Sequence, residues 1–332
     1  MKYVNPYNTV ELYVGDITEP QTIKIYTDSN TSVDIEVSEG NKWYTYALPK
    51  DEGLCMIEGD SVKKVVVKSN ISYEARFQPP FTYGKIIPSS TIEASFKGSN
   101  TSNVTHMGGM FNGCSGLTSL DLSGWDTSNV TDMNSMFQFC NGLTSLTLSN
   151  FNTSNVTHMN GMFYGCSGLT SLDLRNFDTS NVTDMDSVFN GCRGLTSLDL
   201  RNFDTSNVIY MNGMFYGCSG LASLDLSNFV TSKVTNMSTM FNDCSGLTSL
   251  DVSNFDTSNV TNMDGMFNNC ASLTSLDLSG WDMSNVITMN NMFKGCVNLN
   301  TITMVGCSLD TVGKIKTQLK ADGLSEDIVQ TE

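Results

Sequence analysis

One motif recurs every 26 residues over most of this chain and limits its fold more than any other feature of the sequence. Cysteines mark the period, at positions 114, 140, 166, 192, 218, 244, 270 and 296. Seven full repeats begin at residues 117, 143, 169, 195, 221, 247 and 273, after a degenerate copy at about 91–116 and before a truncated one at 299–307. A unit of this size cannot bury its own apolar face, so the copies are expected to stack into a solenoid.

The repeat that begins at Leu143 shows how one coil is expected to fold. Its L-x-x-L-x-L run, residues 143–148, predicts a short strand with the leucines facing inward. Its V-x-x-M-x-x-M-F-x-x-C run, residues 156–166, has a spacing near three and predicts a short strand or tight 3₁₀ turns on the same core. Glycines just before the leucine run predict a turn with positive φ; they are Gly142, Gly168, Gly194, Gly220 and Gly246.

The two ends of the chain differ from the repeats, and all six prolines lie in residues 1–90. Alternating runs within residues 1–78 predict a small antiparallel β-sandwich or barrel that serves for attachment or as a cap; they are 9–14, 22–26, 32–37, 43–48 and 62–67. Residues 79–90 are interpreted as a linker, and residues 91–307 as the solenoid. In residues 308–332, Val312, Ile315 and Leu319 share one face before Gly323, which predicts a capping helix. The predicted fold is therefore mainly β: a leucine-rich-repeat solenoid of about eight coils, preceded by a small antiparallel β-domain and closed by a short C-terminal helix.

The repeated text itself resembles a known family. L-T-S-L-D-L-S-x-[FW]-D-T-S-N-V-T-x-M-x-x-M-F-x-x-C is similar to the BspA-type leucine-rich repeats, which are also seen in mycoplasma surface proteins of the DUF285 kind. The resemblance covers residues 91–307. It implies a leucine-rich-repeat solenoid and a bacterial surface or secreted protein that acts in adhesion.

Charge and hydropathy exclude several classes of function. The net charge is −16, which disfavours a nucleic-acid partner or an anionic membrane. No stretch of about 18 apolar residues occurs, so membrane insertion is not expected. The N-terminus, Met-Lys-Tyr-Val-Asn-Pro, lacks a basic segment followed by an apolar core, so an ordinary signal peptide is not expected either.

The inward-facing rows of the repeat are expected to be structural. Stacked cysteines keep their Cβ atoms about 4.8 Å apart, which is too far for a disulfide, so buried free thiols are predicted. No C-x₂-C pair occurs, and His106 and His158 lie two coils apart, so no metal site or cofactor is predicted from these residues. Methionine and aromatic rows are expected to fill the core. A row of asparagines, which includes Asn181 and Asn207, is expected to bond turn backbone of adjacent coils.

Two outward-facing sets are candidates for a binding surface. The first is an acidic stripe at one strand position, interrupted by Thr147: Asp121, Asp173, Asp199, Asp225, Asp251 and Asp277. Arg175 and Arg201 share its face. Asp173, Asp199, Asp225, Asp251 and Asp277 are candidate Ca²⁺ ligands, and the stripe also suits a basic partner; the alternative is a solvated face produced by repeat copying. The second set comprises aromatic departures from the repeat, which predict a contact patch: Phe139, Tyr164, Tyr210 and Tyr216.

No nucleophile–base pair, phosphate loop or carboxylate dyad emerges, so an enzyme is not predicted. Two hypotheses remain. In the first, the solenoid binds a protein or glycan on a cell or mucosal surface, and the chain is displayed on a bacterial cell or secreted. In the second, it is a bacteriophage virion fibre or decoration protein on the virion surface, whose residues 1–90 dock on a capsid or tail protein or form a homo-oligomer. The absence of an ordinary signal peptide favours the second hypothesis.

Overall fold

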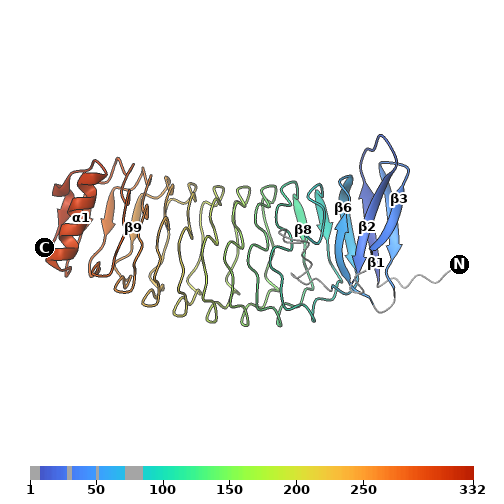
Figure 1. The fold of residues 1–332 in the computed structure, drawn as a ribbon, viewed down its shortest axis with the longest axis horizontal. Coiled ribbons are helices and arrows are strands. Elements are labelled where there is room, and N and C mark those ends of the chain that lie inside the picture. Colours follow the sequence, from blue (N-terminus) through green and yellow to red (C-terminus); the bar gives the residue numbers. More distant parts are fainter. Residues whose placement is uncertain (1–7, 28–31, 50–51, 72–84) are drawn as a thin grey trace.

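The computed structural model describes residues 8–27, 32–49, 52–71 and 85–332. These form a gently curved rod with a small group of strands at the amino-terminal end, stacked coils along its length and one α-helix at the other end (Figure 1). The predicted fold class is confirmed. No helix within the described ranges is long and apolar enough to cross a membrane.

Six strands build the amino-terminal end in two antiparallel sheets, ordered β4-β1-β6 and β3-β2-β5. They are β1 (Thr9–Val14), β2 (Gln21–Thr27), β3 (Ser32–Val37), β4 (Lys42–Ala47), β5 (Leu54–Glu58) and β6 (Val62–Lys68). Five of them coincide with the alternating runs of the sequence. Strand β5 was not predicted, because both Leu54 and Cys55 at its start are buried and the run does not alternate.

Both sheets continue into the solenoid. Strand β6 pairs in parallel with β7 (Glu93–Ser95), which pairs with β8 (Ser119–Asp121) in the first full coil. In the other layer, the amide of Ile57 donates to the carbonyl of Ile86 at 3.0 Å, and the amide of Ile86 donates to Met110 at 2.9 Å. The amino-terminal strands are thus a cap whose two layers become the two faces of the solenoid.

The predicted linker differs from what the structure shows where it can be described. Its residues 79–84 lie outside the described residues. In the described remainder, Ile86 and Ile87 are completely buried. This part belongs to the core, because the cap and the first coil share one apolar interior, and it is not an exposed spacer.

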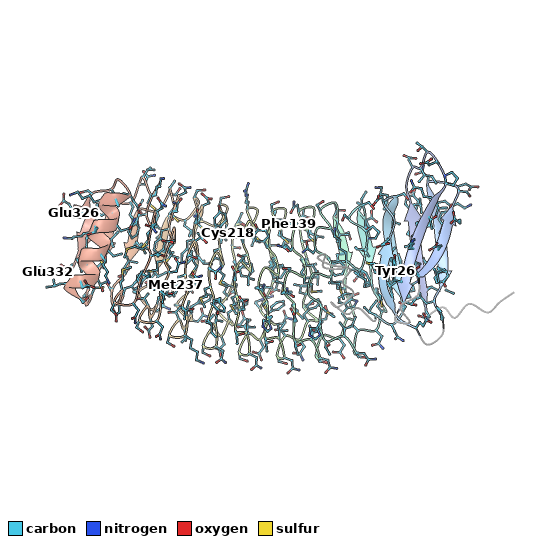
Figure 2. All side chains as sticks on the ribbon, in the orientation of Figure 1. Tyr26, Phe139, Cys218, Met237, Glu326 and Glu332 are labelled. Carbon is cyan, nitrogen blue, oxygen red and sulfur yellow. The ribbon has the colours of Figure 1, made fainter. Side chains whose placement is uncertain are left out.

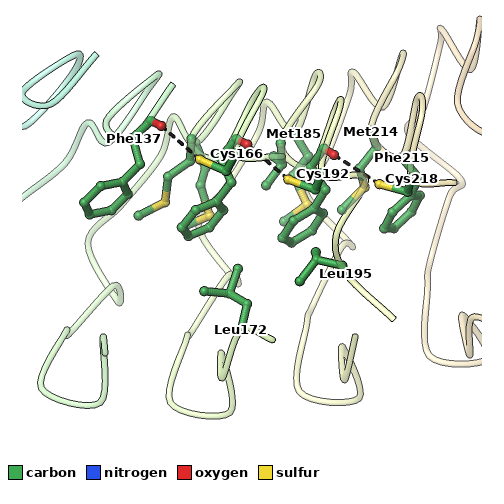
Figure 3. Close-up of a cluster of buried hydrophobic side chains, with 14 of the residues drawn as sticks. Phe137, Cys166, Leu172, Met185, Cys192, Leu195, Met214, Phe215 and Cys218 are labelled. Atoms are coloured by element: carbon green, nitrogen blue, oxygen red, sulfur yellow. Dashed lines mark hydrogen bonds between the residues drawn. The ribbon is translucent and has the colours of Figure 1, made fainter. Parts of the chain in front are cut away.

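The apolar rows of the repeat form one continuous core (Figure 3). Phenylalanine rings of the Phe137 row stack with centroids 5.7–5.9 Å apart along the rod. The cysteine thiols of the repeat are free and buried, and each from Cys140 to Cys296 donates to the carbonyl of a phenylalanine one coil earlier, as Cys192 does to Phe163 at 3.1 Å. Burial raises the pKa of the Cys166 and Cys218 thiols to about 12. The cysteine ladder therefore serves packing.

The two faces of each coil are joined to their neighbours in different ways. We call the V-x-x-M-x-x-M-F-x-x-C run, residues 182–192 in one coil, the turn face, and the L-x-x-L-x-L run, residues 195–200 in the next, the leucine face. On the turn face, backbone bonds join successive coils: Phe189 donates to Met214 at 2.9 Å, and Gly191 donates to Tyr216 at 2.7 Å. This face consists of turns linked by isolated bridges between coils.

The prediction of a strand in every leucine run was wrong for four coils. Strands occur there only in β8, β9 (Ser249–Asp251) and β10 (Ser275–Asp277), with β11 (Thr301–Thr303) continuing the last sheet. The coils that begin at 143, 169, 195 and 221 form none. Backbone bonds hold the coils together on the turn face. The leucine face is less closely stacked, because within these described coils no stacked ring pair joins the phenylalanines that follow the leucine runs, Phe151, Phe177, Phe203 and Phe229. The rings of the Phe137 row, in contrast, stack from coil to coil.

Beside the leucine face, side-chain hydrogen bonds join each coil to the next. The amide of Asn202 donates to the carbonyls of Leu174 at 3.0 Å and Phe177 at 2.6 Å in the preceding coil. Thr179 donates its hydroxyl to Asp204 O and accepts from Asp204 N. The predicted asparagine row is confirmed and adds a third set of bonds, such as Asn207 to Ser180 O at 2.8 Å. The Asn202 and Thr179 rows were not predicted.

The glycines that precede the leucine run have a different role from the one predicted. Gly142, Gly168, Gly194, Gly220 and Gly246 are not among the residues with positive φ. A Cβ on Gly194 would instead lie 2.6 Å from Leu169 O, so the residue must be small because backbone of the preceding coil passes close by.

The carboxyl-terminal end is closed as predicted. Helix α1 (Leu309–Ala321) begins after Ser308, whose side chain accepts from the amide of Thr311. Its buried side chains are Thr311, Val312, Ile315 and Leu319. Asp322 is the C-cap and Gly323 follows in the left-handed conformation, φ +85°. A 3₁₀ turn (Glu326–Ile328) then leads to β12 (Val329–Gln330), which pairs with β11 and covers the sheet edge.

Candidate functional site

The aspartates of the acidic stripe lie on the leucine face, and each is bonded within its own coil. Asp173 pairs with Arg175 and Asp199 with Arg201, with Nη2–Oδ2 distances of 2.8 and 2.7 Å. Hydrogen bonds from these arginines lower the pKa of both carboxyls to about 2. The other four accept from the backbone amide of a serine two residues on, at 2.9–3.1 Å; they are Asp121, Asp225, Asp251 and Asp277. The stripe therefore closes local turns.

A cation site in the stripe receives no support from its geometry. Among the described residues, no group of three or more His, Cys, Asp or Glu side chains is arranged to hold a metal ion. Asp173 and Asp199 already face guanidinium groups. Calcium binding by Asp173, Asp199, Asp225, Asp251 and Asp277 stays a prediction of the sequence alone.

A groove of about 690 Å³ crosses several coils at the end of the turn face. We call it the aromatic groove; its distinctive side chains are Phe139, Tyr164, Arg193, Tyr216, Asp243 and Asn269. Figure 2 shows Phe139 part-way along the rod, in the same half of the view as the buried Cys218. Equivalent positions of successive coils line the groove, so it runs along the rod axis.

Three glycines form the floor of the aromatic groove. Gly165, Gly191 and Gly217 occupy the same column in successive coils, with φ between +67° and +73°. A Cβ on Gly191 would lie 3.4 Å from Gly165 Cα, so the bare backbones are closely stacked. Phe139 and Asp243 hold this column in the coils on either side. They are four coils apart, or about 19 Å at the usual spacing of stacked strands.

Phe139 is the unusual member of this column. Its φ is +58°, whereas every other member is Gly, Asp or Asn. A bulky residue in the left-handed conformation costs about 1–2 kcal/mol. The ring is nevertheless 42% exposed, and packs edge-on against Tyr164 with centroids 4.9 Å apart. A strained backbone at a residue whose ring is largely exposed points to a functional role.

The neighbouring column supplies the two tyrosines. Tyr164 and Tyr216 stand where other coils carry Asn112, Gln138, Asn190, Asn242, Asn268 and Lys294. A hydrogen bond to Asp243, together with burial, raises the pKa of Tyr216. Asp243 also accepts from Asn269 Nδ2 at 2.8 Å. This end of the groove is therefore an ordered polar cluster.

Arg193 is the one basic residue that lines the groove. The same column holds Ser115, Ser167, Ser219 and Ser245 in other coils. Arg175 and Arg201 on the leucine face pair with aspartates, but the guanidinium of Arg193 makes no salt bridge or hydrogen bond with any residue in the described ranges. It is available to a ligand.

The structure divides the binding residues predicted from the sequence into separate groups. Tyr164 and Tyr216 come together with Phe139 in the groove, whereas Tyr210 lies elsewhere on the turn face, bridged to Asp184. The stripe residues Asp121, Asp173, Arg175, Asp199, Arg201, Asp225, Asp251 and Asp277 are not part of the groove. Sequence reasoning missed Arg193, Asp243 and Asn269. Reading the coils column by column would have revealed Arg193 as an arginine among serines.

Comparison with protein families gives one match. The family model described as "Mycoplasma protein of unknown function, DUF285" matches residues 88–197, 141–245 and 220–304. The matched segments overlap and together cover well over half of the chain. A search of curated proteins found no match.

Proposed function

Because the chain belongs to the DUF285 family of repeat proteins, we propose that it is a non-enzymatic recognition protein, displayed at a surface, which binds its ligand in the aromatic groove. The observation that carries this proposal is the gathering of departures from the repeat. Phe139, Tyr164, Arg193 and Tyr216 each replace the residue usual in their column, and all four line one groove. Aromatic and arginine side chains are also the types that dominate binding energy in interfaces.

The amino-terminal end of the rod is the proposed attachment end. The outer edges of β3 and β4 pair with no strand within the described ranges, whereas α1 and β12 cover the other end. Unpaired sheet edges are templates for pairing with another chain. We take the larger assembly to be a bacteriophage virion, with a capsid or tail protein bound through residues 1–90. Display on a bacterial cell surface, or secretion as an adhesin, is the second candidate, and the family match favours it.

Binding of the labelled full-length protein to intact bacterial and epithelial cells, measured by flow cytometry, tests the groove. The test variant carries Phe139→Gly, Tyr164→Asn, Arg193→Ser and Tyr216→Asn, each a residue that other coils carry in the same column. The matched control carries Arg175→Ser and Arg201→Ser on the leucine face. We expect the groove variant to lose more than about tenfold in affinity and the control to bind as the original chain does. Equal binding by all three proteins would refute the groove as the site.

Light scattering on the full-length chain tests attachment through self-association. A trimer or larger assembly favours a fibre held by its amino-terminal strands. A monomer argues against self-assembly and requires a separate docking partner.

A further inference from the structure

The shape of the aromatic groove suits a chain of small rings better than an apolar peptide. Its floor is the backbone of Gly165, Gly191 and Gly217, and the Phe139 ring lies against Gly165 at one end, so the floor itself opens no deep pocket for an apolar side chain. It is long and open, and its lining is divided between apolar and polar groups.

The walls provide both kinds of contact that a sugar needs. A pyranose ring has a face rich in C–H groups, which packs on an aromatic ring, and hydroxyl groups around its edge, which need hydrogen-bond partners. Phe139 and Tyr164 form a fixed aromatic corner at one end, and Tyr216 supplies a third ring. Hydrogen-bonding side chains lie between and beyond them: Asn141, Ser167, Asn190, Ser219 and Asn269.

Charge narrows the class of sugar further. Arg193 is the one cation lining the groove, and Asp243, the one carboxylate, is already bonded by Tyr216 and Asn269. Residues 98–308 hold 16 Asp, no Glu and five Lys or Arg, a net charge of −11, so a polyanion would be repelled. The Arg193 guanidinium, which makes no bond within the described ranges, can hold one carboxylate through two parallel bonds.

We infer that the ligand of the aromatic groove is an oligosaccharide with a single carboxylated sugar. Arg193 binds the carboxylate, and Phe139, Tyr164 and Tyr216 contact the sugar rings. This assignment rests on the proposed recognition function of the groove and adds the chemical class of its ligand.

Calorimetric titration of the full-length protein with sialyllactose and with lactose tests the inference, because the two differ by the carboxylated sugar. We expect sialyllactose to bind more than about tenfold tighter, as one charge-assisted pair provides. Arg193→Ser should remove this difference by weakening sialyllactose binding to the level of lactose, while Arg193→Lys should keep only part of it because lysine lacks the planar fork. Phe139→Gly should weaken the binding of both sugars.

Each outcome separates the ligand class from the site. Equal affinity for the two sugars, or a preference for sialyllactose that survives Arg193→Ser, overturns the carboxylate pairing. If neither sugar binds while the four-residue groove variant still loses cell binding, the glycan inference fails and the proposed function stands. If that variant also keeps full cell binding, both fail. Circular dichroism melts of every variant confirm folding, since other coils of the same protein already carry serine, asparagine or glycine in these columns.

Discussion

The turn face and the leucine face belong to the same coils, but they differ in what joins each coil to the next. The turn face is joined by backbone bonds, such as Met185 to Tyr210 O at 3.0 Å. The leucine side depends on side chains, as where Asn202 bonds two carbonyls of the previous coil. Backbone amides bond whatever side chain they carry, so exposed columns of the turn face can vary without loss of the stack.

This difference explains where the candidate site lies. On the leucine side, a change of Asn202 or Thr179 would remove a junction. The first column is asparagine in the five coils from Asn150 to Asn254, and the second is threonine from Thr101 to Thr257. On the turn face, tyrosine replaces asparagine, and phenylalanine replaces glycine, over an unchanged backbone ladder. The regular columns hold the rod together, and the departures from them form the groove.

The largest loss of stability is expected at alkaline pH, which acts on the core that the two faces share. Burial raises the pKa of Cys114, Cys166, Cys218 and Cys296 to about 12, above the value of a thiol in the unfolded chain. A raised pKa means that the unfolded state loses protons first, so the stabilisation is complete below about pH 8.5 and declines as pH rises toward 12. Each of these thiols lowers the free energy of unfolding by up to about 1.4 kcal/mol per pH unit in that window.

Urea unfolding at a series of pH values checks this expectation. The midpoint should fall steeply above pH 9, and a Cys192→Ala, Cys218→Ala variant should show a shallower decline. A midpoint that is flat up to pH 11 would show that the thiols are not buried as described.

Truncation of one phenylalanine on each side compares the two packings directly. Both Phe215 and Phe203 are buried, so replacement by alanine should cost about 3–5 kcal/mol of unfolding free energy. Phe215 also stacks on Phe189 and Phe241, and each such ring pair adds about 0.5–1.5 kcal/mol. Phe215→Ala should therefore be the more destabilising in chemical denaturation; the reverse order would contradict closer packing beneath the turn face.

Loss of one junction side chain should cost more than a change in the groove. Asn202→Ala removes the donor to Phe177 O and one of two donors to Leu174 O, which keeps the amide of Phe177, a cost of about 1–3 kcal/mol. Tyr216→Asn on the turn face should change the unfolding free energy by under about 1 kcal/mol, because the backbone bond from Gly191 to residue 216 remains. Thermal unfolding of the two variants measures the difference, and equal losses would remove the distinction between the faces.

The smallest effect is expected on the acidic stripe. Arg175→Ser and Arg201→Ser remove exposed ion pairs, so the melting temperature should not change measurably. The pKa of Asp173 and Asp199 should then rise from about 2 toward the ordinary value of an aspartate. Carboxyl titration by NMR reads this change. A clear drop in melting temperature would show that the stripe stabilises the rod.

The sequence was sufficient for the period, the core columns and the closing helix because each depends on apolar spacing alone. Apolar spacing could not show whether strands form in the coils that begin at 143, 169, 195 and 221. A strand ladder requires a certain distance between the backbones of neighbouring coils, and the bonds of the opposite face help to set that distance. Gly194 was misread for a similar reason, since its neighbour Leu169 comes near only through stacking. Arg193, Asp243 and Asn269 line the same groove as Tyr216 but come from different coils, so their proximity appears only when the columns are aligned.

Hydrogen–deuterium exchange on the full-length protein tests the central claim, that a ladder of backbone bonds joins the coils on the turn face, whereas the leucine face of the central coils has isolated ones, such as Thr170 N to Thr144 O. The account predicts slow exchange for the amides of Met211, Gly213, Phe215 and Gly217, each bonded to the next coil. Residues 196–200 of the same coil should exchange much faster. Equal protection of the two segments would contradict the account, because it would mean that a continuous strand ladder joins the leucine face as well.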